Sequence, residues 1–233
     1  MHDQPKPPAD TPDLGRRRFT RAGTAVPVVL GALSSKPVLG ASLTHCTVSG
    51  QVSGNLSRQG LAEDCVVGLS RGDWLSASAW PSPFVKGTQP QATNCSFTGG
   101  VRLRGTNFNG YTPGGGVPAL TATFYNRTVG SPPVCTMDTT TSTNPATMLQ
   151  VLASADPSDT ALTDLYRLAR AVVTSLLNAQ EAFNSGLSYP VTAHTIIAMY
   201  NATCTGGSYW VTASKSWPRG RVIEYLESLY PLA

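Results

Sequence analysis

The run from Asp159 to Asn178 is the part of this 233-residue chain that most constrains its fold. Its apolar residues recur every three or four positions, which is the repeat of one face of an α-helix. That face is made of Leu162, Leu165, Tyr166, Leu168, Ala169, Val172, Val173, Leu176 and Leu177. Because a face this wide has to be covered, we expect this helix to pack against other helices.

Further helices are predicted in the same carboxy-terminal part, residues 144–233. Asn144 and Pro145 form a start signal, with Asn as the cap and Pro at the first helical position. A third helix is expected over about 192–201 and a fourth over about 218–229. This part of the chain is therefore predicted to contain about four helices.

Residues 42–143 differ in character, because turn-forming residues separate short alternating segments. We expect strands over about 47–54, 97–108 and 119–125, with glycine- and proline-rich turns between them. The roughly 190 residues after the first 41 suffice for one domain with a core. We therefore predict an α+β fold in which residues 42–233 form a single domain, with a loop-rich, short-stranded amino-terminal half and a helical carboxy-terminal half.

The first 41 residues have the layout of an export signal. Arg16 and Arg17 form a pair, Phe19 and Arg21 follow, and a weakly apolar run covers residues 22–33. This order resembles the Ser/Thr-Arg-Arg-x-Phe-Leu-Lys pattern of twin-arginine signals, which the twin-arginine export machinery recognises. The resemblance implies that residues 1–41 are a signal peptide and that the mature protein is periplasmic, at the cell surface or extracellular.

Two positions depart from that pattern, since Gly15 replaces Ser/Thr and Thr20 replaces Leu. The apolar run has about a dozen residues, whereas a bilayer span needs about 20. Nothing later in the chain is long and apolar enough to span a membrane, so we expect no transmembrane span in the mature protein. A lipid anchor at Cys46 is the alternative, because Leu43-Thr44-His45-Cys46 resembles a lipoprotein cleavage box.

The net charge of +4 comes mostly from the amino-terminal region. Residues 1–40 hold six of the 17 basic residues and three of the 13 acidic ones, which leaves 11 basic and 10 acidic residues in the remainder. After residue 41 no basic run is interleaved with aromatic residues. Both observations argue against a nucleic-acid partner.

All five cysteines, namely Cys46, Cys65, Cys95, Cys135 and Cys204, follow the predicted signal. An oxidising compartment allows cysteines to pair, and an odd number leaves one over. We predict Cys46–Cys65 and Cys95–Cys135 disulfides, although spacing alone does not fix the connectivity. Cys204 is then expected to stay a thiol, to be modified, or to form an intermolecular bridge.

The run from Cys65 to Trp74 resembles a degenerate form of the Ser-Pro-Gly-Tyr/Phe-Trp-Lys-Asn-His motif. That motif marks a set of exported, mostly uncharacterised bacterial proteins, which tend to have a later helix with a Leu-Asn-Ala signature. Here Leu177-Asn178-Ala179 is similar to that signature. Arg71 and Asp73 replace the Pro and the aromatic residue, and residues 75–77 replace Lys-Asn-His. The resemblance implies an exported accessory or surface module without a settled activity.

The stretch Gly68-Leu69-Ser70-Arg71-Gly72 also fits the Gly-x-Ser-x-Gly nucleophile elbow. A hydrolase of that kind would use Ser70 as its nucleophile and His194 as its base, with Asp156, Asp159 or Asp164 orienting the histidine. Fewer than 30 residues separate the predicted mature start from Ser70, and alternating strands and helices are absent. A structural turn is therefore the preferred interpretation of this motif.

The remaining chemistry is sparse. His45 and His194 lie far apart and have no clustered cysteines or carboxylates beside them, so we predict no metal site and no cofactor. The favoured function is a non-enzymatic accessory, envelope or surface-associated module that binds or assembles with an envelope or surface protein. The alternative is a secreted serine hydrolase using Ser70 and His194. A third possibility, a folded cofactor carrier, is suggested only by the export route.

Overall fold

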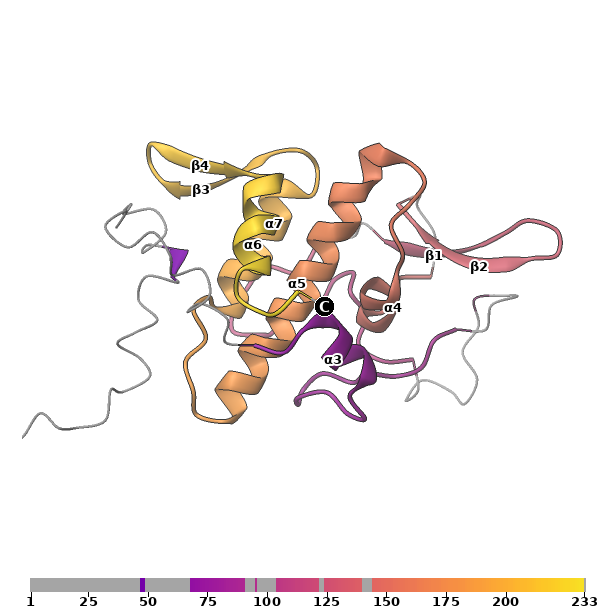
Figure 1. Cartoon of the computed structure of the whole chain (residues 1–233), viewed down its shortest axis with the longest axis horizontal. Coiled ribbons are helices and arrows are strands. Elements are labelled where there is room, and N and C mark those ends of the chain that lie inside the picture. Colours follow the sequence, from indigo (N-terminus) through magenta and orange to yellow (C-terminus); the bar gives the residue numbers. More distant parts are fainter. Residues whose placement is uncertain are drawn as a thin grey trace, which may run out of the picture. The chain divides into compact units, whose positions relative to one another are not determined.

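The fold is organised around the long helix that the apolar repeat predicts (Figure 1). The computed structural model describes residues 47–48, 68–90, 95, 104–121, 124–139 and 144–232. All of these residues belong to one compact unit, Leu39–Ala233. Its elements in chain order are α3 (Arg71–Ser76), β1 (Tyr125–Val129), β2 (Val134–Asp138), α4 (Met148–Ala153), α5 (Thr160–Asn184), α6 (Ala193–Thr203), β3 (Ser208–Thr212), β4 (Lys215–Pro218) and α7 (Arg219–Glu227). The predicted α+β class and the helical carboxy-terminal half are confirmed.

Helix α5 contacts α3, α4, α6 and α7, and Figure 1 shows it between α4 on one side and α6 and α7 on the other. Its predicted apolar face is buried from Leu165 to Leu177, while Leu162 is half-buried. The helix continues beyond Asn178 to Asn184 and is terminated by Gly186, two residues later, whose positive φ of 68° suits a residue without a side chain. The described helices include none long and apolar enough to cross a bilayer.

Helix α4 begins later than predicted. Thr147 caps it, because the Thr147 hydroxyl accepts a hydrogen bond from the Gln150 backbone N–H and the Gln150 side chain accepts one from the Thr147 N–H. Pro145 instead forms an isolated β-bridge with Tyr125. The start signal at Asn144-Pro145 is therefore wrong by three residues, since the capping box at Thr147 satisfies the first helical N–H groups and Pro145 is used in pairing.

The strand predictions in the amino-terminal half are tested only in part, because many of the residues concerned lie outside the described ranges. The described strands there are β1 and β2, which pair antiparallel as a hairpin, and β1 begins only at Tyr125. Of the segments expected to be strands, 104–108 contains only an isolated β-bridge at Asn107 and 119–121 is irregular, whereas 49–54 and 97–103 lie outside the described residues. Phe108, Leu120 and Phe124 insert fully buried side chains into the core. Single backbone hydrogen bonds, such as those of Ala146 with Phe108 (2.9 Å) and Phe124 (3.0 Å), are formed there in place of a regular strand ladder.

A second hairpin, β3–β4, lies within the part predicted to be helical. Its strands pair antiparallel, with Tyr209 opposite Trp217. Trp217 is buried, whereas Trp210 is 65% exposed. This hairpin was not predicted, because only helices were expected in this part of the chain. At its start Gly207 lies close against Ala202, and a Cβ at this position would be 2.4 Å from the Ala202 carbonyl oxygen.

Edge-to-face aromatic contacts join the irregular amino-terminal layer to the helices. Phe124 lies 5.0 Å from Tyr166 of α5, and Phe108 lies 5.2 Å from Tyr200 of α6, measured between ring centroids. Phe108 and Phe124 also contact each other at 5.7 Å. Such pairs add to the burial of apolar area, so these four rings tie the two halves into one core.

Candidate functional site

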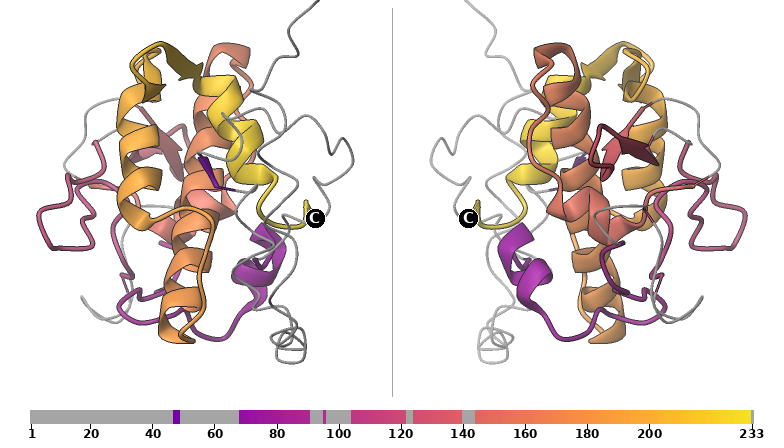
Figure 2. Two further views of the ribbon diagram at one scale, coloured as in Figure 1. Left: turned by 90° about the vertical axis from the view of Figure 1, so that its left-hand side faces the viewer. Right: turned by 90° about the vertical axis from the view of Figure 1, so that its right-hand side faces the viewer.

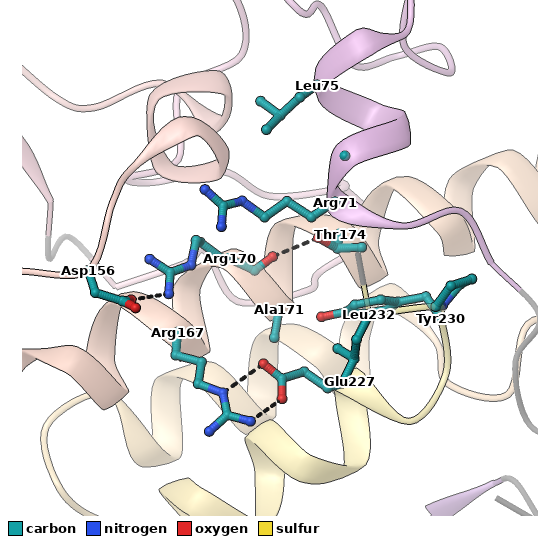
Figure 3. A pocket seen from close by; sticks show the side chains of 12 residues that line it. Arg71, Leu75, Asp156, Arg167, Arg170, Ala171, Thr174, Glu227, Tyr230 and Leu232 are labelled. Carbon is teal, nitrogen blue, oxygen red and sulfur yellow. Dashed lines mark hydrogen bonds and ion pairs between the residues drawn. The ribbon is translucent and has the colours of Figure 1, made fainter. Parts of the chain in front are cut away.

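A pocket of about 360 Å³ opens where α3, α5 and the segment after α7 meet (Figure 3). Figure 2 shows the carboxy-terminal end of the chain beside α3. Ionisable side chains dominate the wall of the pocket: Arg71, Asp156, Arg167, Arg170, Glu227 and Tyr230. Three arginines therefore face two carboxylates.

Helix α3 is attached to α5 by the side chain of Asn178, which is only 4% exposed. Its Oδ1 accepts hydrogen bonds from the Leu69 N–H (2.8 Å) and the Trp74 indole N–H (3.1 Å), while its Nδ2 donates to the Leu69 carbonyl (3.0 Å). A Cβ on Gly68 would lie 2.4 Å from the Asn178 amide nitrogen, so only glycine fits there. These contacts hold the start of α3, and hence Arg71, at the pocket.

Ser70 is the N-cap of α3. Its hydroxyl donates to the Asp73 carboxylate (2.7 Å) and accepts from the Asp73 N–H (3.1 Å), and its own N–H donates to the same carboxylate (2.8 Å). These bonds from Ser70 lower the pKa of Asp73. The Gly-x-Ser-x-Gly stretch thus contains a capping box, and Ser70 is only 5% exposed.

Arg71 and Arg170 share one acceptor at the pocket. Arg71 donates from Nε to the Leu152 carbonyl (2.6 Å) and from Nη2 to the Ser154 carbonyl (2.9 Å). Arg170 donates from Nη1 to that same Ser154 oxygen (3.2 Å) and from Nη2 to the Asp156 carboxylate. Burial, followed by the positive charge of Arg170, lowers the pKa of Arg71. Two guanidinium groups therefore lie side by side, and one carboxylate, that of Asp156, is bonded to Arg170.

The other end of the pocket is close to neutral. Arg167 donates from Nε to Glu227 (2.8 Å) and from Nη2 to the second oxygen of the same carboxylate, and these bonds raise the pKa of Arg167. Burial raises the pKa of Tyr230, so its hydroxyl is neutral at physiological pH. The positive charge in excess is therefore concentrated at the Arg71–Arg170 end.

The structure places the two residues of the predicted hydrolase in separate settings. His194 is exposed in the first turn of α6, and no hydrogen bond among the described residues joins it to Ser70. Asp156, a candidate for orienting His194, is bonded to Arg170 instead, and this bond lowers the pKa of Asp156. In the structure Ser70 caps α3, whereas the serine hydrolase alternative would use it as the nucleophile.

The predicted Cys95–Cys135 disulfide is confirmed. Cys95 and Cys135 form a disulfide that ties β2 to the preceding segment. Cys46 and Cys65 lie outside the described residues, as do the signal residues Arg16 to Arg21. Cys204 is a buried thiol whose sulfur lies 3.7 Å from the Asn201 carbonyl. Within the described ranges, histidines, cysteines and carboxylates form no cluster that could hold a metal ion.

The arginines of this pocket were not predicted as site residues. The sequence does indicate that Arg170 is unusual, because it interrupts an otherwise apolar run from Leu168 to Val173. In the structure Arg170 is only 9% exposed. A charge inside an apolar helix face has to be paired or used, since burying it alone is costly. Arg71 carried no such signal, because its role depends on α3 packing against the end of α4.

The two segments that carry the motif resemblance meet in the structure, through the hydrogen bond from Trp74 to Asn178. In this contact a buried indole N–H and a buried amide oxygen satisfy each other. Comparisons with protein-family models, curated proteins and solved structures found no match to this chain. The resemblance to the exported motif proteins stays a prediction.

Proposed function

We propose that this protein is an exported, non-enzymatic accessory module of the cell envelope or surface, which binds its partner through the arginine pocket. The observation that carries the proposal is the pocket itself, where three arginines face two carboxylates. Arg71 and Arg170 are held in place by carbonyl oxygens and by Asp156. Arginine forks fixed in this way recognise anionic groups with defined geometry.

The chemistry of the pocket favours binding over catalysis. A guanidinium group stays protonated at any physiological pH, so it does not serve as a general acid or base there. The carboxylates of Asp156 and Glu227 are engaged by Arg170 and Arg167. These side chains are suited to hold a charged group, whereas the capped Ser70 is engaged in starting α3.

Export is supported by the twin-arginine pattern and by a disulfide, because disulfides persist mainly in oxidising compartments. To test it, we would express the chain in a host with the twin-arginine machinery and compare wild type with the Arg16→Lys/Arg17→Lys variant. We expect export and cleavage of wild type and retention of the variant. Arg18→Lys is the matched control, since it changes only the spacer position, and equal export of all three would contradict the proposal.

Binding through the pocket is tested by site-specific photo-crosslinking on intact cells. A crosslinker at Leu232, which lines the pocket and is 72% exposed, should capture a partner. A crosslinker at Leu187, which is also exposed but lies beyond the end of α5, is the control and should capture none. Adducts of equal yield from both positions, or from neither, would contradict pocket-mediated binding.

A further inference from the structure

The Arg71–Arg170 pair has more positive charge and more hydrogen-bond donors than its neighbours use. We infer that the pocket binds the oxyanion head group, a carboxylate or a phosphate, of a small organic ligand between Arg71 and Arg170. This inference rests on the proposed binding function and names the class of ligand.

The donor geometry supports an oxyanion. Arg71 forms its two bonds through Nε and Nη2, which leaves its Nη1 group without an acceptor in the described part of the chain. Among the described carboxylates none forms an ion pair with Arg71, whereas Arg170 is paired with Asp156. The two guanidinium groups approach the same Ser154 oxygen at 2.9 and 3.2 Å, so they are close enough to bind one anion together.

Figure 3 shows both guanidinium groups extending to the same side of the pocket, toward Asp156. An anion placed between them would relieve the repulsion between two like charges, which Asp156 offsets only in part. Planar oxyanions match the arginine fork, because two parallel N–H donors bind two oxygens at once. A halide ion is a single acceptor atom, so it cannot place separate acceptors opposite the two N–H donors of one fork.

The rest of the pocket limits the body of the ligand. Leu75, Ala171 and Leu232 contribute apolar surface, which suits a short aliphatic chain. A volume of about 360 Å³ is near the lower end for ligand pockets, so the body is small. Glu227 already pairs with Arg167 at the far end, so a second anionic group there would be repelled. We therefore expect one head group rather than two.

The test is a calorimetric titration of the purified full chain at fixed ionic strength with sodium hexanoate, hexyl phosphate, sodium adipate and hexanol. Hexanoate or hexyl phosphate should bind; adipate, a dianion of similar length, should bind more weakly, and hexanol should not bind. Hexanoate alone would identify a carboxylate ligand and hexyl phosphate alone a phosphate ligand. Arg71→Gln should weaken binding about ten-fold or more, because one charge-assisted pair of hydrogen bonds is lost. Arg127→Gln removes an exposed arginine on β1 and should leave the affinity unchanged.

Leu232→Asp provides a second variant that does not depend on α3, because this side chain is exposed after α7. The added negative charge at the pocket should also weaken oxyanion binding. Circular dichroism of each variant checks that it is folded. Three outcomes would overturn the inference: binding of neither hexanoate nor hexyl phosphate to wild type, equal binding of hexanol, or an affinity that neither Arg71→Gln nor Leu232→Asp changes.

This titration separates the ligand class from the proposed function. If neither hexanoate nor hexyl phosphate binds but the crosslinker at Leu232 still captures a partner, the ligand class is wrong and the binding module stands. If one of them binds as expected but the chain is not exported and captures no partner, the ligand class stands and the proposed function is wrong.

Discussion

Replacing Asn178 with Ala removes the contact that attaches α3 to α5. The substitution deletes three hydrogen bonds, two with the Leu69 backbone and one with the Trp74 indole. Each such bond contributes a net of about 1 kcal/mol, and a buried donor left without an acceptor adds about 1 kcal/mol more. Because the Leu69 side of the site is partly exposed and water can replace some of the lost bonds, we expect Asn178→Ala to lower the free energy of unfolding by about 2–4 kcal/mol.

Urea unfolding followed by circular dichroism measures this loss. Asn184→Ala is the matched control on the same helix, since Asn184 is exposed and bonds the Ser82 carbonyl near the end of α5; it should cost less than about 0.5–1 kcal/mol. A double-mutant cycle with Trp74→Phe isolates the indole bond, and we expect a coupling energy of about 1 kcal/mol. The reasoning is refuted if Asn178→Ala costs no more than Asn184→Ala, or if the two substitutions at Asn178 and Trp74 are additive.

Three other perturbations probe separate parts of the structure. Ser70→Ala should destabilise the protein by about 1 kcal/mol through loss of the α3 cap, measured by urea unfolding, and should leave fluorophosphonate labelling unchanged; labelling lost in this variant would instead support the serine hydrolase. Replacing Cys95 and Cys135 with Ser removes the disulfide, which closes a loop with a sequence separation of 40. In the chain-entropy model this should lower the free energy of unfolding by about 4 kcal/mol, and a loss below about 1 kcal/mol would argue against an effect on the unfolded chain. Burial raises the pKa of Tyr111 to about 12, so its stabilising effect is complete below about pH 10 and is lost as pH rises through about 12. Burial also raises the pKa of Tyr189. Alkaline titration at 295 nm should show the ionisation of these two tyrosines coinciding with the loss of circular dichroism; tyrosines that all ionise near pH 10 in the folded protein would contradict this.

The helical half could be predicted because local patterns determine it. The repeat from Leu165 to Leu177 identified the buried face of α5, since only a helix places those side chains on one side. The Cys95–Cys135 pair was one choice among the few pairings that five cysteines allow, since sequence spacing leaves the connectivity open. Both features depend on residues close in sequence or on a small number of possible partners.

The arginine pocket could not be predicted from such patterns, because it joins residues far apart in the chain. Arg71 meets the carbonyl of Ser154 across 83 positions, and Asn178 meets Leu69 across 109. The motif at Ser70 matches a nucleophile elbow in spacing, but a structural turn was the preferred interpretation, and the side chain caps the start of α3. In the described part of the predicted strands, Phe108 and Phe124 form backbone hydrogen bonds with Ala146, a partner that no local pattern identifies.

Native mass spectrometry of the protein recovered after export tests the central claim most directly. The account predicts a chain that begins near residue 41 or 42 and retains a small anionic ligand, which is released on denaturation and is missing from Arg71→Gln. Arg127→Gln should retain the ligand. Recovery of a chain that still contains the Arg16-Arg17 pair and holds no ligand, or a bound mass that Arg71→Gln does not change, would contradict the account of an exported module that binds through its arginine pocket.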